Sequence, residues 1–110
     1  MNYSILELKN LMELAKTAAF SAGNKHLEEH GEQWCCGFAW VDIRGIKGNT
    51  KLGRAMKAAG YEQDYTRAFS IWDPSGIATQ CMSTKEAGAR AAAKVFNDAG
   101  FTAFASSRPD

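Results

Sequence analysis

Residues 34–43 read WCCGFAWVDI, and this stretch decides the fold of the chain. It is rich in aromatic, β-branched and small residues and is too short between its flanking glycines to be a core helix, so we expect a buried strand. Because side chains alternate along a strand, its two faces differ. Large rings dominate the first face, which carries Trp34, Cys36, Phe38 and Trp40. Smaller side chains suited to close packing of helices form the second, with Cys35, Gly37, Ala39, Val41 and Ile43.

Three helices are marked by capping signals. Ser4 and Glu7 form a capping box ahead of apolar residues at helical spacing, and Thr50 is a cap for a short second helix. Ser83 and Glu86 repeat the capping box ahead of an alanine-rich segment. The sequence therefore predicts helices at 5–22, 50–59 and 84–98, with a broken continuation of the first to residue 30 left open.

The remaining strands complete an α+β fold. Residues 73–76 read DPSG, which is typical of a type I turn, so the flanking strands should pair as a hairpin. The predicted strands are 34–43, 66–72, 77–82 and 101–106. After the N-terminal helix, the order β-α-β-β-α-β is the split βαβ arrangement of ferredoxin-like folds, with helices on one sheet face. We expect a single domain, 1–110, with an N-terminal helical segment, 1–31, and an α+β core, 32–110.

The other face of this sheet is expected to be open. Trp34, Phe38 and Trp40 would form an apolar patch there that is too large to leave in water. We expect the N-terminal helix, a second subunit or a ligand to cover it, and a homo-oligomer is the expected assembly. RNA-recognition domains share this strand order and stack bases on sheet aromatics, but the first strand lacks their basic and glycine-aromatic alternation. Core or oligomer packing is the preferred interpretation.

Composition defines the class of protein. The 110 residues are 45% hydrophobic and 23% charged, as in globular domains. Thirteen basic and twelve acidic residues give a formal charge of +1, which argues against a nucleic-acid partner. The sequence has no long apolar run and no secretory signal, so we expect a cytoplasmic protein without a membrane partner. Cys35, Cys36 and Cys81 match no metal or redox spacing, and we expect them to be reduced and buried.

Catalytic signatures are missing from the sequence. Residues 26–30 read HLEEH, which matches the H-x-x-E-H pattern of some zinc hydrolases, but no separate helix offers a third ligand. A solvated helix end is the preferred interpretation. There is no serine elbow, no Ser/His/Asp set and no Cys-His pair in a suggestive context. We therefore expect no enzymatic activity, no metal and no cofactor.

The loop at residues 44–51 reads RGIKGNTK and is the most informative candidate site. Its glycines let the backbone approach a ligand, and the following helix start offers N–H groups to an anion. It is not a Walker A loop, and an ordinary strand-to-helix turn is the alternative. An arginine just past the last predicted strand can clamp phosphate. The expected ligand-binding residues are Lys47, Gly48, Asn49, Thr50, Arg67, Arg108 and, for stacking on a base, Trp72.

Several motifs together resemble a widespread group of small phage and prophage proteins. They are CGFAWV at 36–41, GNTK at 48–51, KEA at 85–87, AGFTA at 99–103 and SRPD at 107–110. The resemblance implies a phage-encoded accessory protein in the host-cell cytoplasm. More loosely, the chain resembles the Thoeris anti-defence proteins, which act as sponges that sequester a cyclic ADP-ribose signal without cleaving it.

The expected function comes from the loop and the resemblance together. We expect a non-enzymatic protein that binds and sequesters a small phosphate-bearing nucleotide of host defence, of the cyclic ADP-ribose type. Two alternatives stay open. The first is a protein-binding inhibitor of host machinery, of the anti-defence or anti-CRISPR type. The second is a nucleic-acid-binding module that uses the open sheet face.

Overall fold

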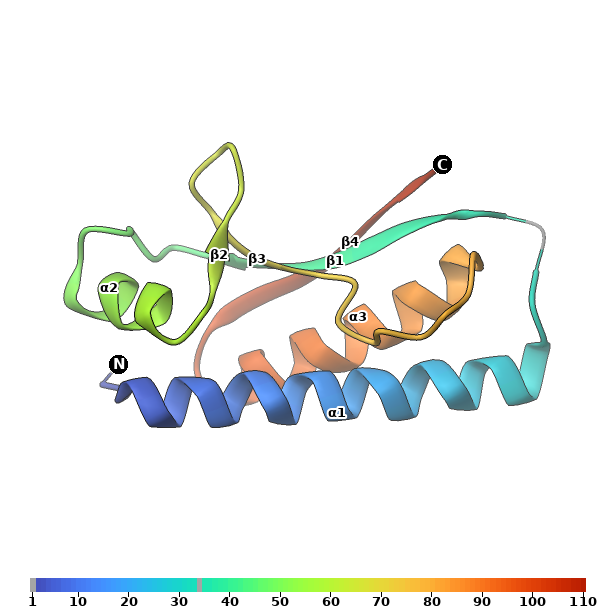
Figure 1. Ribbon diagram of the computed structural model, residues 1–110, viewed down its shortest axis with the longest axis horizontal. Coiled ribbons are helices and arrows are strands. Elements are labelled where there is room, and N and C mark those ends of the chain that lie inside the picture. Colours follow the sequence, from blue (N-terminus) through green and yellow to red (C-terminus); the bar gives the residue numbers. More distant parts are fainter. Residues whose placement is uncertain (1, 34) are drawn as a thin grey trace.

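The computed structural model describes residues 2–33 and 35–110, and these form an α+β fold (Figure 1). A long N-terminal helix is followed by strands and shorter helices in the order β1-α2-β2-β3-α3-β4. The helices are α1 (Ile5–His30), α2 (Lys51–Ala58) and α3 (Met82–Asp98). The strands are β1 (Gly37–Arg44), β2 (Glu62–Gln63), β3 (Phe69–Trp72) and β4 (Thr102–Pro109).

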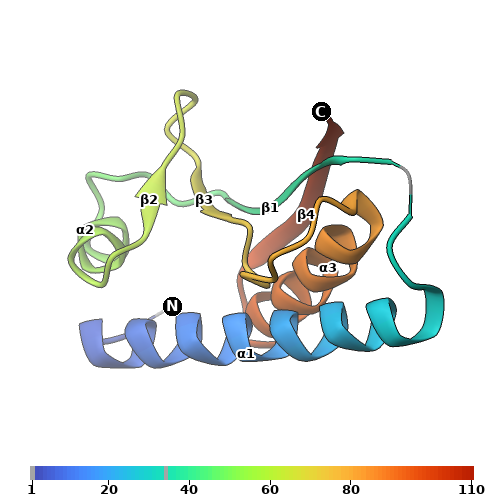
Figure 2. The same cartoon turned by 45° about the vertical axis from the view of Figure 1, so that its right-hand side comes forward.

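The strands form one antiparallel sheet in the order β2-β3-β1-β4. Its register places Trp40 opposite Trp72 on one side and opposite Ser106 on the other. Helix α3 packs on β1 and β4, α1 packs on α3, and α2 packs against α1 near the end of the sheet, as Figures 1 and 2 show. The α+β class is as predicted. The layering differs in detail, since α3 lies directly on the sheet and α1 forms a further layer beneath it.

Helix α1 begins at its predicted cap and runs further than predicted. The Ser4 hydroxyl accepts from the Glu7 N–H at 3.1 Å, and the Glu7 carboxylate accepts from the Ser4 N–H at 2.9 Å, which completes the capping box. The helix continues unbroken through Gly23 and ends at Gly31, whose φ of 67° favours glycine. Gly23 is buried in the helix interior, where an added Cβ would lie 2.4 Å from Ile77 Cδ1. Its small size allows close packing.

The hairpin predicted at residues 66–82 is wrong. The turn does form, with the Gly76 N–H donating to the Asp73 carbonyl at 3.1 Å, but residues 77–81 do not pair with β3. Strand β3 pairs instead with β2, a two-residue strand that was not predicted. Local hydrogen bonds explain the difference, because the Thr79 hydroxyl takes the Cys81 N–H at 3.1 Å. Such side-chain bonds compete with a sheet ladder.

The predicted second capping box is also wrong. Helix α3 starts at Met82, two residues earlier than predicted, and its N-cap is Cys81 without a side-chain cap bond. Ser83 and Glu86 therefore lie inside the helix. The Glu86 carboxylate instead accepts a hydrogen bond from the Ser107 hydroxyl of β4 at 2.7 Å.

The core lies between α1, α3 and the small-residue face of β1. Ala39, Val41 and Ile43 are buried as predicted, and Phe38 and Trp40 on the opposite face are half-buried. Trp34 lies outside the described residues. Because α1 lies below α3 on the helical side, it does not lie over Phe38 and Trp40 (Figure 1). The first of the three predicted covers is thus wrong.

The cysteines only partly match their predicted burial. Cys81 is buried, but Cys35 and Cys36 are exposed, because they precede β1 in a segment that pairs with the sheet only through the Cys36–Cys81 bridge. All three thiols are free. Burial raises the pKa of the Cys81 thiol, but hydrogen bonds from Thr84 and from nearby backbone groups outweigh burial and lower it overall.

Candidate functional site

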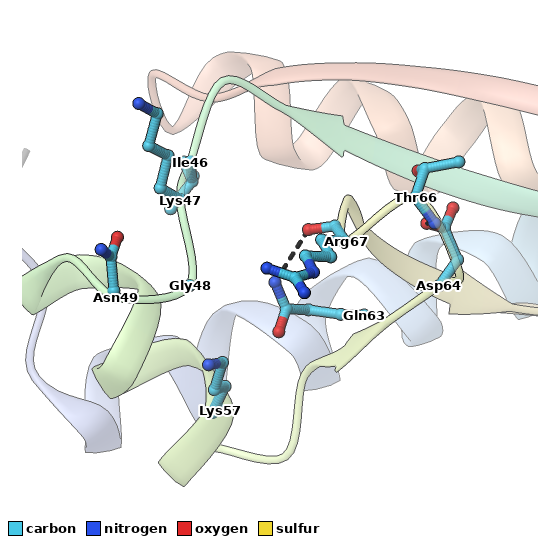
Figure 3. A pocket seen from close by; sticks show the side chains of 9 residues that line it. All are labelled: Ile46, Lys47, Gly48, Asn49, Lys57, Gln63, Asp64, Thr66 and Arg67. Atoms are coloured by element: carbon cyan, nitrogen blue, oxygen red, sulfur yellow. Dashed lines mark hydrogen bonds between the residues drawn. The ribbon is translucent and has the colours of Figure 1, made fainter.

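A cavity of about 680 Å³ opens where three segments meet: the β1–α2 loop, the end of α2 and the β2–β3 hairpin (Figure 3). Arg67 and Gln63 project from the hairpin toward the loop, Lys57 comes from α2, and Lys47 lies on the loop. The lining residues are Ile46, Lys47, Gly48, Asn49, Lys57, Gln63, Asp64, Thr66 and Arg67. The structure therefore brings Lys47, Gly48, Asn49 and Arg67, four of the predicted site residues, to one place.

Thr50 shapes the loop wall of the cavity without lining it. Its hydroxyl accepts from the Gly53 N–H at 3.1 Å and donates to the Lys47 carbonyl at 2.7 Å. Gly53 is buried, and a Cβ there would lie 2.1 Å from the Lys47 carbonyl oxygen. The loop is thus folded tightly onto the first turn of α2. Thr50 is an N-cap, as predicted, and it holds Lys47 in position.

Gly48 brings the backbone close to two nitrogen donors. A Cβ at this position would lie 2.8 Å from the Lys57 Nζ and 2.8 Å from the Gln63 Nε2. Both atoms are the ends of flexible side chains, so the two donors gather where only glycine leaves room. Lys57 and Gln63 were not among the predicted site residues. Lys57 follows the loop by one helix length, but Gln63 depends on β2, for which the sequence carries no clear strand signal.

The hairpin holds its own conformation through Asp64. This carboxylate accepts hydrogen bonds from the Thr66 N–H at 2.8 Å and the Ala68 N–H at 3.3 Å, and Thr66 also donates its hydroxyl. The Thr66 hydroxyl lowers the pKa of Asp64, partly opposed by burial, so the group is an anion at neutral pH. Arg67 has a left-handed φ of 67°, and its carbonyl accepts from Gln63 Nε2 at 2.8 Å. The hairpin thereby presents Arg67 to the cavity.

The cavity is positively charged. Lys47, Lys57 and Arg67 line it, against the single carboxylate of Asp64, which its own turn already uses. In the part of the chain that the structure describes, the ion pairs involve other residues, and none of these three cations takes part. Such an arrangement can bind an anion through charge-assisted hydrogen bonds. The nine lining residues include no aromatic ring, so base stacking would need a group outside the lining.

Trp72 and Arg108 lie elsewhere. Arg108 pairs with Phe38 at the start of β1, whereas the loop follows Arg44 at its end. The strand from Phe38 to Arg44 spans about 20 Å, so Arg108 cannot reach the cavity. Trp72 lies opposite Trp40 in the sheet. The seven predicted residues therefore do not surround one ligand; they divide between the loop cavity and the open sheet face.

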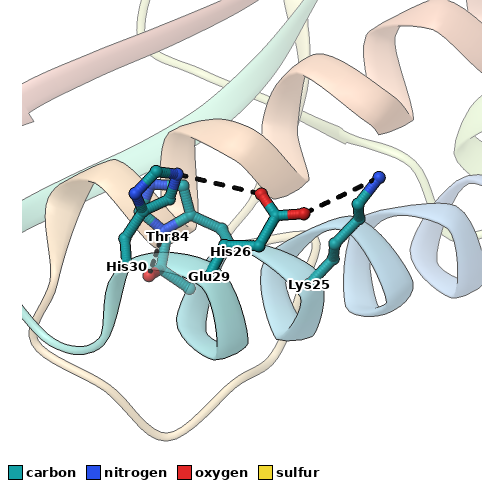
Figure 4. Close-up of polar contacts among 5 residues, drawn as sticks. All are labelled: Lys25, His26, Glu29, His30 and Thr84. Carbon is teal, nitrogen blue, oxygen red and sulfur yellow. Dashed lines mark hydrogen bonds and ion pairs between the residues drawn. The ribbon is translucent and has the colours of Figure 1, made fainter.

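The H-x-x-E-H motif joins two helices (Figure 4). His26 Nδ1 lies 3.0 Å from the Thr84 hydroxyl of α3, so this histidine packs in the helix interface. The rings of His26 and His30 are 4.7 Å apart, and Glu29 pairs with Lys25 at 3.9 Å and with His30 at 3.8 Å. Within residues 2–33 and 35–110, no group of three His, Cys, Asp or Glu side chains is arranged to hold a metal ion.

Comparisons of the chain with protein-family models, with curated proteins and with solved structures found no match. None of the helices in the described part has the length and apolar character needed to cross a membrane. The assignment of a function therefore depends on the geometry of the two sites.

Proposed function

We propose that this protein binds a small phosphate-bearing molecule in the loop cavity and holds it without chemical change. The observation that carries the proposal is the convergence of Lys47, Lys57 and Arg67 on one cavity beside the backbone of Gly48. A guanidinium can bind two phosphate oxygens at once, and an ammonium supplies a mobile point charge. Together they favour a ligand with more than one negative charge.

The size of the cavity supports a small-molecule ligand. Ligand sites commonly measure about 300–1,000 Å³, and the 680 Å³ found here lies within that range. The glycine in the wall supports a phosphate in particular, because a backbone without Cβ lets phosphate oxygens come close to N–H groups. A nucleotide with two phosphates, of the cyclic ADP-ribose type, is the ligand that we favour. Its role as a host defence signal rests on the resemblance to phage proteins.

Sequestration is favoured over catalysis because of how the site's polar groups are used. Asp64 is the one carboxylate of the lining, and its oxygen already accepts the hydrogen bonds of its turn. A general base needs a free lone pair within reach of the proton that it removes. Three cations without such a base favour binding alone.

Calorimetry tests the proposal with pyrophosphate, linear ADP-ribose and cyclic ADP-ribose derivatives. We expect binding that weakens about tenfold or more in Arg67→Ala, because a charge-assisted hydrogen bond contributes about 1.5–3 kcal/mol. Arg90→Ala is the matched control, since Arg90 is exposed on α3 outside the cavity. Ligand recovered after heat denaturation should be unchanged by chromatography. An altered ligand would refute sequestration, and no binding to any member of the panel would refute the proposal.

A protein-binding inhibitor is the second candidate, and one observation favours it. Helix α1 exposes Leu6 by 67%, Leu14 by 58% and Phe20 by 54%. These positions lie within about one third of the helix circumference. Such an apolar stripe suits a partner protein. If the nucleotide panel gives no binding and Leu14→Glu abolishes capture of a specific host protein, this candidate replaces the first.

A further inference from the structure

Three rings form an aromatic cluster on the open face of the sheet, which we call the aromatic patch: Phe38, Trp40 and Trp72. The Trp40 and Trp72 rings stack with centroids 5.5 Å apart and planes 15° apart. The Phe38 ring lies 5.5 Å from that of Trp72. Trp72 remains 56% exposed, so the cluster offers a broad apolar surface to a ligand.

Two cations lie beside the same rings. The Arg108 guanidinium is 5.5 Å from the centre of the Phe38 ring, and the Lys85 Nζ is 5.4 Å from it. Lys85 is only 9% exposed, and its Nζ donates to the Gly37 carbonyl at 3.2 Å. Across residues 2–33 and 35–110, neither cation belongs to an ion pair. A buried ammonium held by a neutral carbonyl and a ring leaves donor capacity for an anion.

The carboxylate on this face does not cancel the positive charge. Asp42 lies on the same face of β1 as Phe38 and Trp40, but it is only 7% exposed. It accepts a hydrogen bond from the Ser106 hydroxyl of β4 at 2.6 Å. Its charge is thus directed into the sheet, whereas Arg108 is exposed.

We propose that the aromatic patch, with Arg108 and Lys85, binds a planar ring that carries a negative charge, as a nucleoside monophosphate does. The ring would stack on Trp72, since stacking on an aromatic side chain tolerates any base. The phosphate would lie toward Arg108 and Lys85. A flat apolar partner or a second copy of the chain is a poorer fit, because it would bury both cations without a counter-charge.

This site is separate from the loop cavity. Phe38 and the loop lie at opposite ends of β1, about 20 Å apart by the length of the strand. The inference therefore goes beyond the proposed function, and either site can fail without the other.

Tryptophan fluorescence is the readout, with AMP as the probe and adenosine and ribose 5-phosphate as the comparison ligands. We expect AMP to quench fluorescence and to bind more tightly than either fragment. Trp72→Leu should weaken AMP binding about fivefold or more through lost stacking. Arg108→Gln should weaken AMP binding about tenfold and leave adenosine binding unchanged. Arg90→Gln is the matched control, and circular dichroism checks that each variant folds.

Three results would overturn the inference. The first is AMP binding that is equally strong in Trp72→Leu and Arg108→Gln, or no AMP binding to the wild-type protein at all. The second is a dimer, detected by sedimentation, that Trp72→Leu dissociates, which would make a second copy the occupant. The third is a single-stranded oligonucleotide that binds this face while AMP does not, which would assign the face to nucleic acid.

Discussion

Replacing Gly88 by alanine tests the close contact between α1 and α3. Gly88 is buried in α3, and an added Cβ would lie 2.8 Å from Ser75 Cβ and 3.1 Å from the Ala19 carbonyl oxygen of α1. Alanine gains about 1 kcal/mol in helix propensity. Forcing two backbones apart costs about 1–3 kcal/mol. We expect a net loss of about 1 kcal/mol in the free energy of unfolding, measured by urea denaturation, and a fall of about 4 °C in Tm.

Gly23→Ala is the matched control on α1. Its nearest neighbour is Ile77 Cδ1 at 2.4 Å, the end of a side chain that can rotate, and the next atoms are at 3.6 Å. The cost of crowding should be smaller there, so Gly23→Ala should be more stable than Gly88→Ala. If Gly88→Ala instead stabilises the protein by the full helix-propensity gain of about 1 kcal/mol, α1 and α3 do not meet as described.

Three further predictions concern the thiols, the core and alkaline pH. A thiol-specific reagent should modify Cys35 and Cys36 quickly in the folded protein and Cys81 only after unfolding, and fast reaction of all three would contradict the burial of Cys81. Leu8→Ala should lower the free energy of unfolding by about 3 kcal/mol in urea, because Leu8 is fully buried; an effect below about 1 kcal/mol would be inconsistent with that burial. Burial raises the pKa of Tyr61 from its ordinary 10.0, so the unfolded chain loses this proton first and stability should fall as pH rises above 10. Tyr61→Phe should flatten that fall, which is measured by denaturation at several pH values.

Much of the fold could be predicted from local signals. The Ser4 capping box, the Thr50 cap and the alternation from Ala39 to Ile43 each depend on residues near in sequence, and each was right. The error at residues 77–82 arose because a good turn signal does not determine whether the next residues pair back as a strand. There the hydroxyls of Ser75 and Thr79 bind the local backbone, which the turn residues do not reveal.

The candidate site was predictable only within one segment. Lys47, Gly48 and Asn49 are consecutive, so their loop could be recognised directly, and Arg67 joined them through a hairpin whose first strand was not predicted. Arg108 was misplaced because the register between β4 and β1 cannot be read from the residue pattern of either strand. Once Arg108 is paired with Phe38, its distance from the loop is set by strand geometry alone.

The most direct test of the loop cavity is to map where pyrophosphate binds by ¹⁵N-resolved NMR of the full chain. We predict shifts of the backbone amides of Lys47, Gly48, Gln63 and Arg67 that saturate together, with little change at Phe38 or Arg108. Shifts that stay linear and are scattered over surface lysines, or none in the loop and hairpin, would contradict the loop cavity as the anion-binding site.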